Sequence, residues 1–250
     1  MTRQFAISPD VNVRHISDWF ILNTRIQRLT GESLHATTYE DFADLHRAFD
    51  DGHADLVYAN AADTAVLVRD RGYVPIAAPA AVSNEAAVVV SDAGPFRRLE
   101  DLGSSLRVAA TDAPDVERIC RILLEPADLD RSSLHLVVKP NPVLVAKALL
   151  VGEVEAAFLP REAFDELSSL IRAELRILIS SQIYVVRHCL LASRALAHQV
   201  DTIWAGLRAM SDSTDDADLL VGLGAPHGWE RMTVDDTDFM IDLMDALIQA

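Results

Sequence analysis

Lysine is scarce in this sequence: Lys139 and Lys147 are the only lysines among 22 basic residues, which face 38 acidic ones and leave a formal net charge of −16. Nucleic acids and anionic membrane surfaces are bound through clustered positive charge, which so acidic a chain does not offer. We therefore expect neither as a partner. A small anion remains an acceptable ligand, because backbone N–H groups at a helix N-terminus or a single Arg can hold one.

Cysteine is rare too, and the usual motifs of metal and catalytic chemistry are missing. Cys120 and Cys189 stand far apart, without the spacing of a zinc site or a disulfide scaffold. The eight histidines show no H-E-x-x-H pattern, and the sequence has no G-x-S-x-G nucleophile turn. No uninterrupted apolar stretch reaches the ~18 residues that crossing a bilayer takes. The sequence thus predicts no metal, no cofactor and no membrane insertion.

No secretory leader precedes the first predicted strand. Met1-Thr2-Arg3 runs directly into Gln4-Phe5-Ala6-Ile7, without an apolar segment of about 7–15 residues and a small-residue cleavage site. The sequence as written favours the cytoplasm. If a leader was removed, the periplasm is expected instead.

What the sequence does contain is a regular alternation of strand and helix patterns. Short apolar runs at 4–8 and 34–38 are followed by stretches of 3.6-residue periodicity at 15–29 and 39–49. Further strands are expected at 55–58, 74–78, 85–91, 106–110, 134–138, 155–159, 175–180 and 189–193, and further helices at 61–69, 114–125, 142–151, 161–170, 195–210 and 238–248. Repeated strand-helix-strand units predict mostly parallel sheets covered by helices on both faces.

The alternation restarts twice, near residues 80–90 and near residues 185–195. A domain inserted into another, joined to it by two crossing strands, produces this layout. We therefore predict an α/β fold with two lobes, in which residues 1–83 and 194–250 form a discontinuous first lobe and residues 84–193 the second. Ligands of such folds bind at the carboxyl ends of the strands, which places the expected site in a cleft between the lobes.

Several segments, in matching order and spacing, resemble one known family. They are F-A-I-S-P at 5–9, G-H-A-D-L-V-Y at 52–58, G-Y-V-P-I-A-A-P at 72–79, a strand, a Pro and L-E-D-L-G within 87–103, A-L-L-V-G-E-V-E-A-A at 148–157, and G-W through Phe239 from residue 228. Together they resemble the phosphonate/phosphite/phosphate substrate-binding proteins of ABC transporters, which have the type II periplasmic-binding-protein fold. The resemblance implies a non-catalytic receptor that closes its two lobes on a small polar or anionic ligand, with a transporter or a sensory protein as its partner.

The sequence departs from this family where its members bind the phosphoryl group. Members carry a Ser-Thr-Ser run at a helix N-terminus, and the corresponding loop here reads A-T-D-A-P-D at 110–115. One hydroxyl remains, and two carboxylates that repel a phosphonate have arrived, although either also suits a helix N-cap. The family's His falls near Asn141-Pro142, its crossover Tyr near Asn84, and its amine-binding acidic residue near Arg187-His188. The resemblance therefore implies the fold and the receptor role, with the phosphonate-site motif not retained.

Polar side chains after the predicted strand ends are the candidate ligand-binding residues. They are Ser8, Asp10, Tyr58, Asn60, Asn84, Glu85, Thr111, Asp112, Lys139, Asn141, Ser181 and Tyr184. Any one of these residues also fits a turn, where Asn, Asp and Ser bond their own backbone. As a set they favour a ligand cleft. Lys139 could supply the positive charge that an anionic ligand needs, or could be a solvated loop lysine.

Two other functions stay open. The fold resembles that of cytoplasmic lyases that act on small chorismate-derived carboxylates, in which case Asp10, Glu85 or Asp112 would be the general base. No motif of those enzymes is present, so the sequence favours a non-catalytic receptor over an enzyme. A third reading is a degenerate family member that acts through a protein partner.

Overall fold

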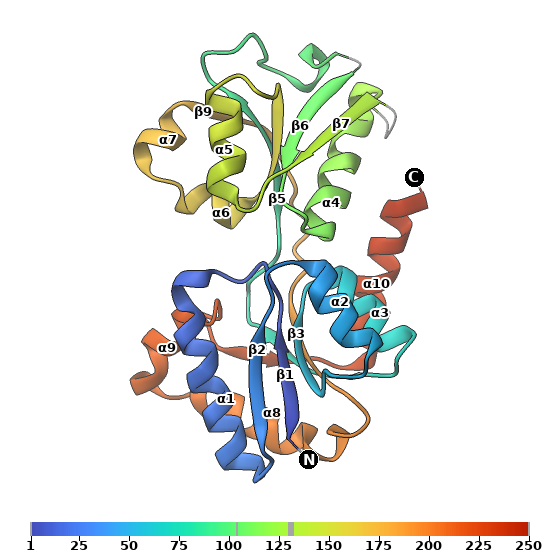
Figure 1. The fold of residues 1–250 in the computed structure, drawn as a ribbon, viewed down its shortest axis with the longest axis vertical. Coiled ribbons are helices and arrows are strands. Elements are labelled where there is room, and N and C mark those ends of the chain that lie inside the picture. The colour runs from blue at the N-terminus through green and yellow to red at the C-terminus, as the bar shows by residue number, and fades with distance from the viewer. Residues whose placement is uncertain (1, 104, 130–132, 250) are drawn as a thin grey trace. The chain divides into compact units, whose positions relative to one another are not determined.

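The computed structural model describes residues 2–103, 105–129 and 133–249. The chain divides into two compact units, one comprising Met1–Ser83 and Val186–Met244, the other Asn84–Val185 with Asp245–Ala250 (Figure 1). Each unit holds one sheet with helices on both faces, so the predicted α/β fold built from two parts is confirmed.

The first unit is built on six strands in the spatial order β11-β4-β10-β3-β1-β2. Their bounds are β1 Arg3–Ile7, β2 Leu34–Thr38, β3 Leu56–Ala59, β4 Val74–Pro79, β10 Cys189–Ala192 and β11 Trp229–Arg231. Four strands run in one direction, as the sequence predicts, while β10 and β11 run against them. Because β10 is paired on both sides within this sheet, residues 189–193, which the sequence analysis assigned to the second lobe, lie in the first unit.

Helices cover both faces of this first sheet (Figure 1). They are α1 Ile16–Thr30, α2 Phe42–Asp50, α3 Ala61–Arg69, α8 Val200–Ser211, α9 Ala217–Gly222 and α10 Val234–Gln249, with short 3-10 turns at Val13–His15, Ala197–Gln199 and Thr214–Asp216. Phe5 and Ile7 of β1 pack with Trp19 of α1 and Ile203 of α8 in one core. This alternation of buried side chains fixes α1 and α8 on one face, and α2 and α3 take the other.

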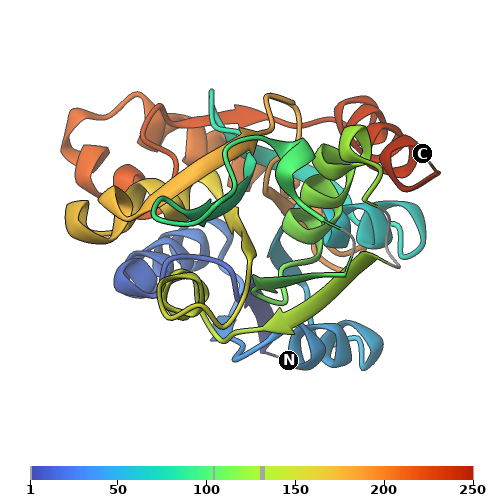
Figure 2. The same ribbon diagram turned by 90° about the horizontal axis from the view of Figure 1, so that it is seen from above.

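The second unit has five strands in the order β7-β6-β8-β5-β9. Its elements are β5 Ala86–Ser91, β6 Leu106–Ala110, β7 Leu134–Val138, β8 Ala156–Pro160, β9 Leu175–Ser180, α4 Pro114–Leu124, α5 Pro142–Leu150, α6 Arg161–Glu166 and α7 Ser169–Ala173, with 3-10 turns at Leu99–Asp101 and Glu125–Ala127. Only β5 runs against the other four strands. Ala87 and Val89 face a core shared with α5, and α4 covers the opposite face (Figure 2).

Local sequence explains most of the element ends and some of the differences. Helix α1 stops at Gly31, whose φ of 73° is left-handed backbone that glycine adopts without strain. The single helix predicted at 161–170 is two short ones, because Leu167 is extended and Ser168 caps α7 by accepting from Ile171 N. Strand β11 was not predicted. Across the described ranges, no helix combines the length and the apolar character needed to traverse a bilayer.

Candidate functional site

The strand ends gather the candidate residues at one edge of each sheet. In the first sheet, Ile7 of β1 and Leu190 of β10 both pair with Tyr58 of β3, so β10 begins where β1 and β3 end. Ser8, Asp10, Tyr58 and Asn60 lie at this edge. In the second sheet, β5 begins where the other four strands end, and that edge holds the remaining eight candidates, which are Asn84, Glu85, Thr111, Asp112, Lys139, Asn141, Ser181 and Tyr184.

An ion pair of low exposure lies at the edge of the first sheet. His188 Nε2 is 3.0 Å from Asp10 Oδ1, and the two side chains are 15% and 16% exposed. Burial by itself raises the pKa of Asp10, but the charge and hydrogen bond of His188 outweigh burial and lower the pKa of that carboxyl below its ordinary value. The Ser8 hydroxyl adds to this lowering from close by, although its geometry falls short of a regular hydrogen bond. Asp10 is therefore held as a carboxylate.

The Tyr58 ring stacks against the imidazole of His188. His188 stacks on Tyr58 with 5.1 Å between ring centroids and an interplanar angle of 19°. Trp19 lies 4.3 Å from the same ring, and Trp229 meets it edge-on at 6.1 Å. Tyr58 and both tryptophans are at most 5% exposed. The phenol ring is thus part of the core, and its stacking contact orients the His188 ring.

Three N–H donors at this edge are buried without an acceptor among the described residues: Trp229 Nε1, Asn60 Nδ2 and Arg187 Nε. Asn60 Oδ1 is occupied, because it caps α3 by accepting from Asp63 N at 2.8 Å. Arg187 is bound at Nη1 by the Glu230 carboxylate. Leaving a buried donor unpaired costs about 1–3 kcal/mol, so an acceptor that reached any of these three N–H groups would be stabilised by it.

In the second unit, Glu85 and Ser181 hydrogen-bond backbone N–H groups of their own unit. The Glu85 carboxylate accepts from Ile183 N at 3.0 Å, from Tyr184 N at 2.8 Å and from the Ser181 hydroxyl. Ser181 Oγ in turn accepts from Ala86 N at 2.9 Å. Glu85 and Ser181 therefore clamp the loop after β9 to the start of β5, and Tyr184 within that loop has a left-handed φ of 59°.

The other candidates of the second unit are also engaged or acidic. Lys139 Nζ donates to Glu153 Oε1 at 2.6 Å, so the expected positive charge is neutralised. Asn141 Oδ1 caps α5 by accepting from Leu144 N at 3.0 Å. Thr111 is half-buried and Asp112 exposed just ahead of α4, and Asn84, half-buried, precedes β5. The positive charge that the sequence analysis sought for an anion is thus already paired with a carboxylate.

His188 and Trp229 were missing from the candidates chosen from the sequence. His188 is 178 positions from Asp10, and only the antiparallel placement of β10 brings them together. Trp229 opens a strand of three residues, which is too short to give a periodic signal. The one available hint was that a charged position of the resembling family falls near Arg187-His188.

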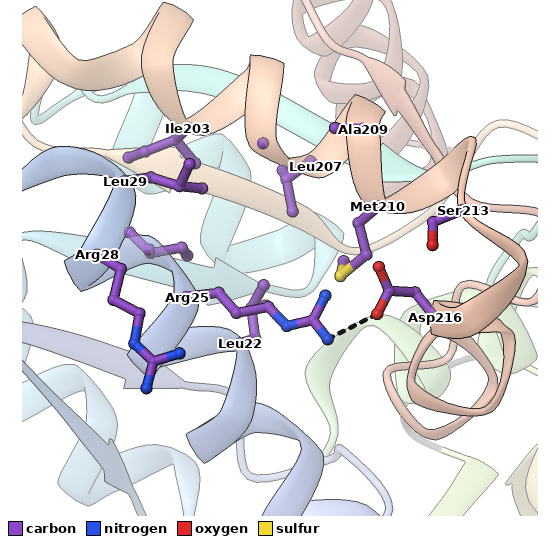
Figure 3. A pocket seen from close by; sticks show the side chains of 12 residues that line it. Leu22, Arg25, Arg28, Leu29, Ile203, Leu207, Ala209, Met210, Ser213 and Asp216 are labelled. Atoms are coloured by element: carbon purple, nitrogen blue, oxygen red, sulfur yellow. Dashed lines mark ion pairs between the residues drawn. The ribbon is translucent and has the colours of Figure 1, made fainter.

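Two cavities in the first unit lie apart from all of these residues. One of about 440 Å³ is formed by α1 and α8 (Figure 3). Its wall is mostly apolar and is crossed by an ion pair of 2.6 Å between Arg25 and Asp216. The other, near Arg3 and Asp55, lies where β1 and β3 begin. None of the candidate residues lines either cavity, and no cluster of three metal-ligating side chains occurs in the described ranges.

Two α/β units, each with polar side chains at the strand ends, are the architecture of the periplasmic-binding-protein fold. The sequence matches the family described as "ABC transporter, phosphonate, periplasmic substrate-binding protein" over residues 5–237, and the chain belongs to this family. The predicted role of a substrate-binding receptor is thereby confirmed. Such proteins bind small ligands and hand them to a transporter.

Solved structures share the fold at low identity. PhnD1 from Prochlorococcus marinus in complex with methylphosphonate is 11% identical, with 100% of this chain and 99% of that chain covered and a TM-score of 0.80. XAC2383 from Xanthomonas citri bound to chloride is 13% identical over 99% and 97%, with a TM-score of 0.77. The aliphatic sulphonate binding protein SsuA from Escherichia coli is 14% identical over 99% and 91%, with a TM-score of 0.67. No curated protein matches the sequence.

Proposed function

We propose that this protein is a receptor for a small polar molecule that offers hydrogen-bond acceptors to the edge of the first sheet. One arrangement carries the proposal: the sheet edge that holds the Asp10–His188 pair also holds buried N–H groups of Asn60 and Trp229 that have no acceptor among the described residues. Buried donors are normally satisfied, so a set of them next to a fixed charge pair is typical of a ligand site. The ligand's oxygen or nitrogen atoms would supply the missing acceptors.

We further propose that this ligand is not a phosphonate. The loop ahead of α4 offers one hydroxyl, on Thr111, and the carboxylate of Asp112, and Asp115 follows in the first turn of α4. Asp115 is 1% exposed, and its Oδ1 accepts from Val116 N at 2.9 Å. A helix N-terminus that already carries acidic side chains has less attraction for a dianionic phosphoryl group.

A ligand screen tests the receptor function. The full chain would be heated with methylphosphonate, inorganic phosphate, alkylsulfonates, carboxylates, amines and neutral sugars, because a bound ligand raises the apparent stability by mass action. We expect at least one non-phosphonate hit, confirmed by calorimetry and weakened in Asp10→Asn and His188→Gln. The hit should be recovered chemically unchanged after long incubation. No shift with any compound would refute the receptor, and turnover of the hit would make the protein an enzyme.

The partner, the closure and the compartment are further parts of this proposal. A membrane transporter or a sensory protein would receive the ligand-bound form, which co-purification with and without the ligand would test.

Closure of the two units on the ligand predicts a smaller radius of gyration in solution scattering when the ligand is added. The sequence analysis favours the cytoplasm, whereas the family's description is periplasmic. Separation of cytoplasmic and periplasmic fractions decides between them.

A further inference from the structure

The cations at the edge of the first sheet are already matched by carboxylates. His188 faces Asp10 at 3.0 Å, and Arg187 is tied to Glu230. Each cation here is already paired with a carboxylate. A ligand with two negative charges would therefore lie next to two carboxylates that repel it. A ligand with one charge meets half of that repulsion.

At the edge of the second sheet the candidate cation is paired as well. Lys139 donates to Glu153 at 2.6 Å, and the segment ahead of α4 carries Asp112 and, inside the helix, Asp115. Acidic side chains thus lie at the strand ends of each sheet, and at either edge they would repel a dianion more than a monoanion.

The unpartnered N–H donors at the edge of the first sheet suit a ligand with one negative charge better than a ligand with two. Trp229 Nε1 and Asn60 Nδ2 are uncharged N–H groups, and both residues are at most 5% exposed. Trp229 meets the same Tyr58 ring on which His188 stacks, so one phenol ring links the indole to the imidazole of the ion pair. Neutral donors in a site of low exposure hydrogen-bond an oxyanion without adding charge, which balances one negative charge better than two.

We propose that the head group recognised in the first unit is a singly charged oxyanion, a carboxylate or a sulfonate or sulfate, whose oxygens accept from Trp229 and Asn60 beside the Asp10–His188 pair. This inference rests on the proposed receptor function and narrows it to a ligand class. It separates this protein from a receptor for doubly charged phosphoryl compounds.

The decisive comparison uses two ligands of one shape and different charge. Ethyl sulfate carries one negative charge, whereas ethyl phosphate carries close to two at neutral pH because its second pKa is about 6. Propanoate supplies the carboxylate arm. Calorimetric titration of the full chain with each should show ethyl sulfate or propanoate binding at least about tenfold tighter than ethyl phosphate, a factor that corresponds to about 1.4 kcal/mol.

Two pairs of variants test the donors. Trp229→Phe keeps an aromatic ring and removes the N–H, and Trp204→Phe, on α8 outside the edge, is its control. Asn60→Ser keeps an N-cap oxygen for α3 and removes the amide, and Asp41→Ser is the control at the cap of α2. Trp229→Phe and Asn60→Ser should each weaken binding by about tenfold, while both controls bind as wild type. Thermal melts confirm that all four variants are folded.

Each outcome decides something different. Equal or tighter binding of ethyl phosphate, or unchanged binding by folded Trp229→Phe and Asn60→Ser, overturns the monoanion proposal and leaves the receptor intact. Hits confined to amines or neutral sugars overturn it as well. If no compound of the wider screen binds, the receptor function fails together with the narrower inference.

Discussion

Replacing Glu85 with Ala should loosen the loop that follows β9. Glu85 accepts from Ile183 N at 3.0 Å, from Tyr184 N at 2.8 Å and from the Ser181 hydroxyl. Tyr184 is exposed, so water can take over that bond, whereas Ser181 is 6% exposed and cannot exchange its partner so easily. Hydrogen bonds to a charged group contribute about 1.5–3 kcal/mol each and do not add fully, so we expect a loss of about 2–4 kcal/mol in unfolding free energy.

Hydrogen exchange is the assay that reports on this loop directly. The three tryptophans, at positions 19, 204 and 229, all lie in the first unit, so their fluorescence does not follow the second. Amides of residues 181–184 should exchange faster in Glu85→Ala, and urea unfolding followed by circular dichroism should give the free energy. Glu174→Ala, an exposed glutamate of the same unit, is the matched control. Unchanged exchange together with a loss below about 0.5 kcal/mol would refute the clamp.

Three further predictions concern the first unit. Asp10→Asn should lower the free energy of unfolding by up to roughly 3 kcal/mol at neutral pH, measured by urea denaturation. Because the pKa of Asp10 is lowered in the folded state, the difference between variant and wild type should vanish as the pH falls through that pKa. The hydrogen bond with Asp63 raises the pKa of His46. The loss of unfolding free energy in His46→Gln should therefore be largest in mild acid and fade as the pH rises through that pKa. Because the His46 side chain is 47% exposed, this loss should stay below about 1 kcal/mol. Gly228→Ala should lower the free energy of unfolding by roughly 2 kcal/mol and shift the tryptophan emission. The φ of Gly228 is 81°, and an added Cβ would lie 2.6 Å from Ser211 Cβ.

Most elements of the fold could be read from local patterns. Strands at 34–38, 106–110, 134–138 and 175–180 and the helix at 61–69 have the bounds that the sequence predicts, because apolar periodicity reflects which side chains face a core. The sheet to which the fragment Cys189–Ala192 belongs could not be read in this way. Its residues are apolar throughout and suit either sheet, and only its pairing with β3 and β4 decides.

The positions of the candidate residues relative to the strands could be predicted, but their individual contacts could not. Eleven of the twelve follow or precede strands at the expected edges and Tyr58 lies within the end of β3, because a strand's end is visible in the sequence. Whether a side chain there faces a ligand depends on its neighbours in space. Asn60 and Asn141 cap helices, and Lys139 meets Glu153, a residue 14 positions away.

The sequence by itself determined the alternation of strands and helices, the division into two parts and the resemblance to a family of substrate-binding proteins, since each depends on residues close together in the chain. Tertiary structure alone decided which groups face one another. It paired Asp10 with His188, tied Glu85 to the loop after β9, and left Trp229 Nε1 without an acceptor among the described residues. The two pairings join residues that are far apart in the chain, so no local pattern encodes them.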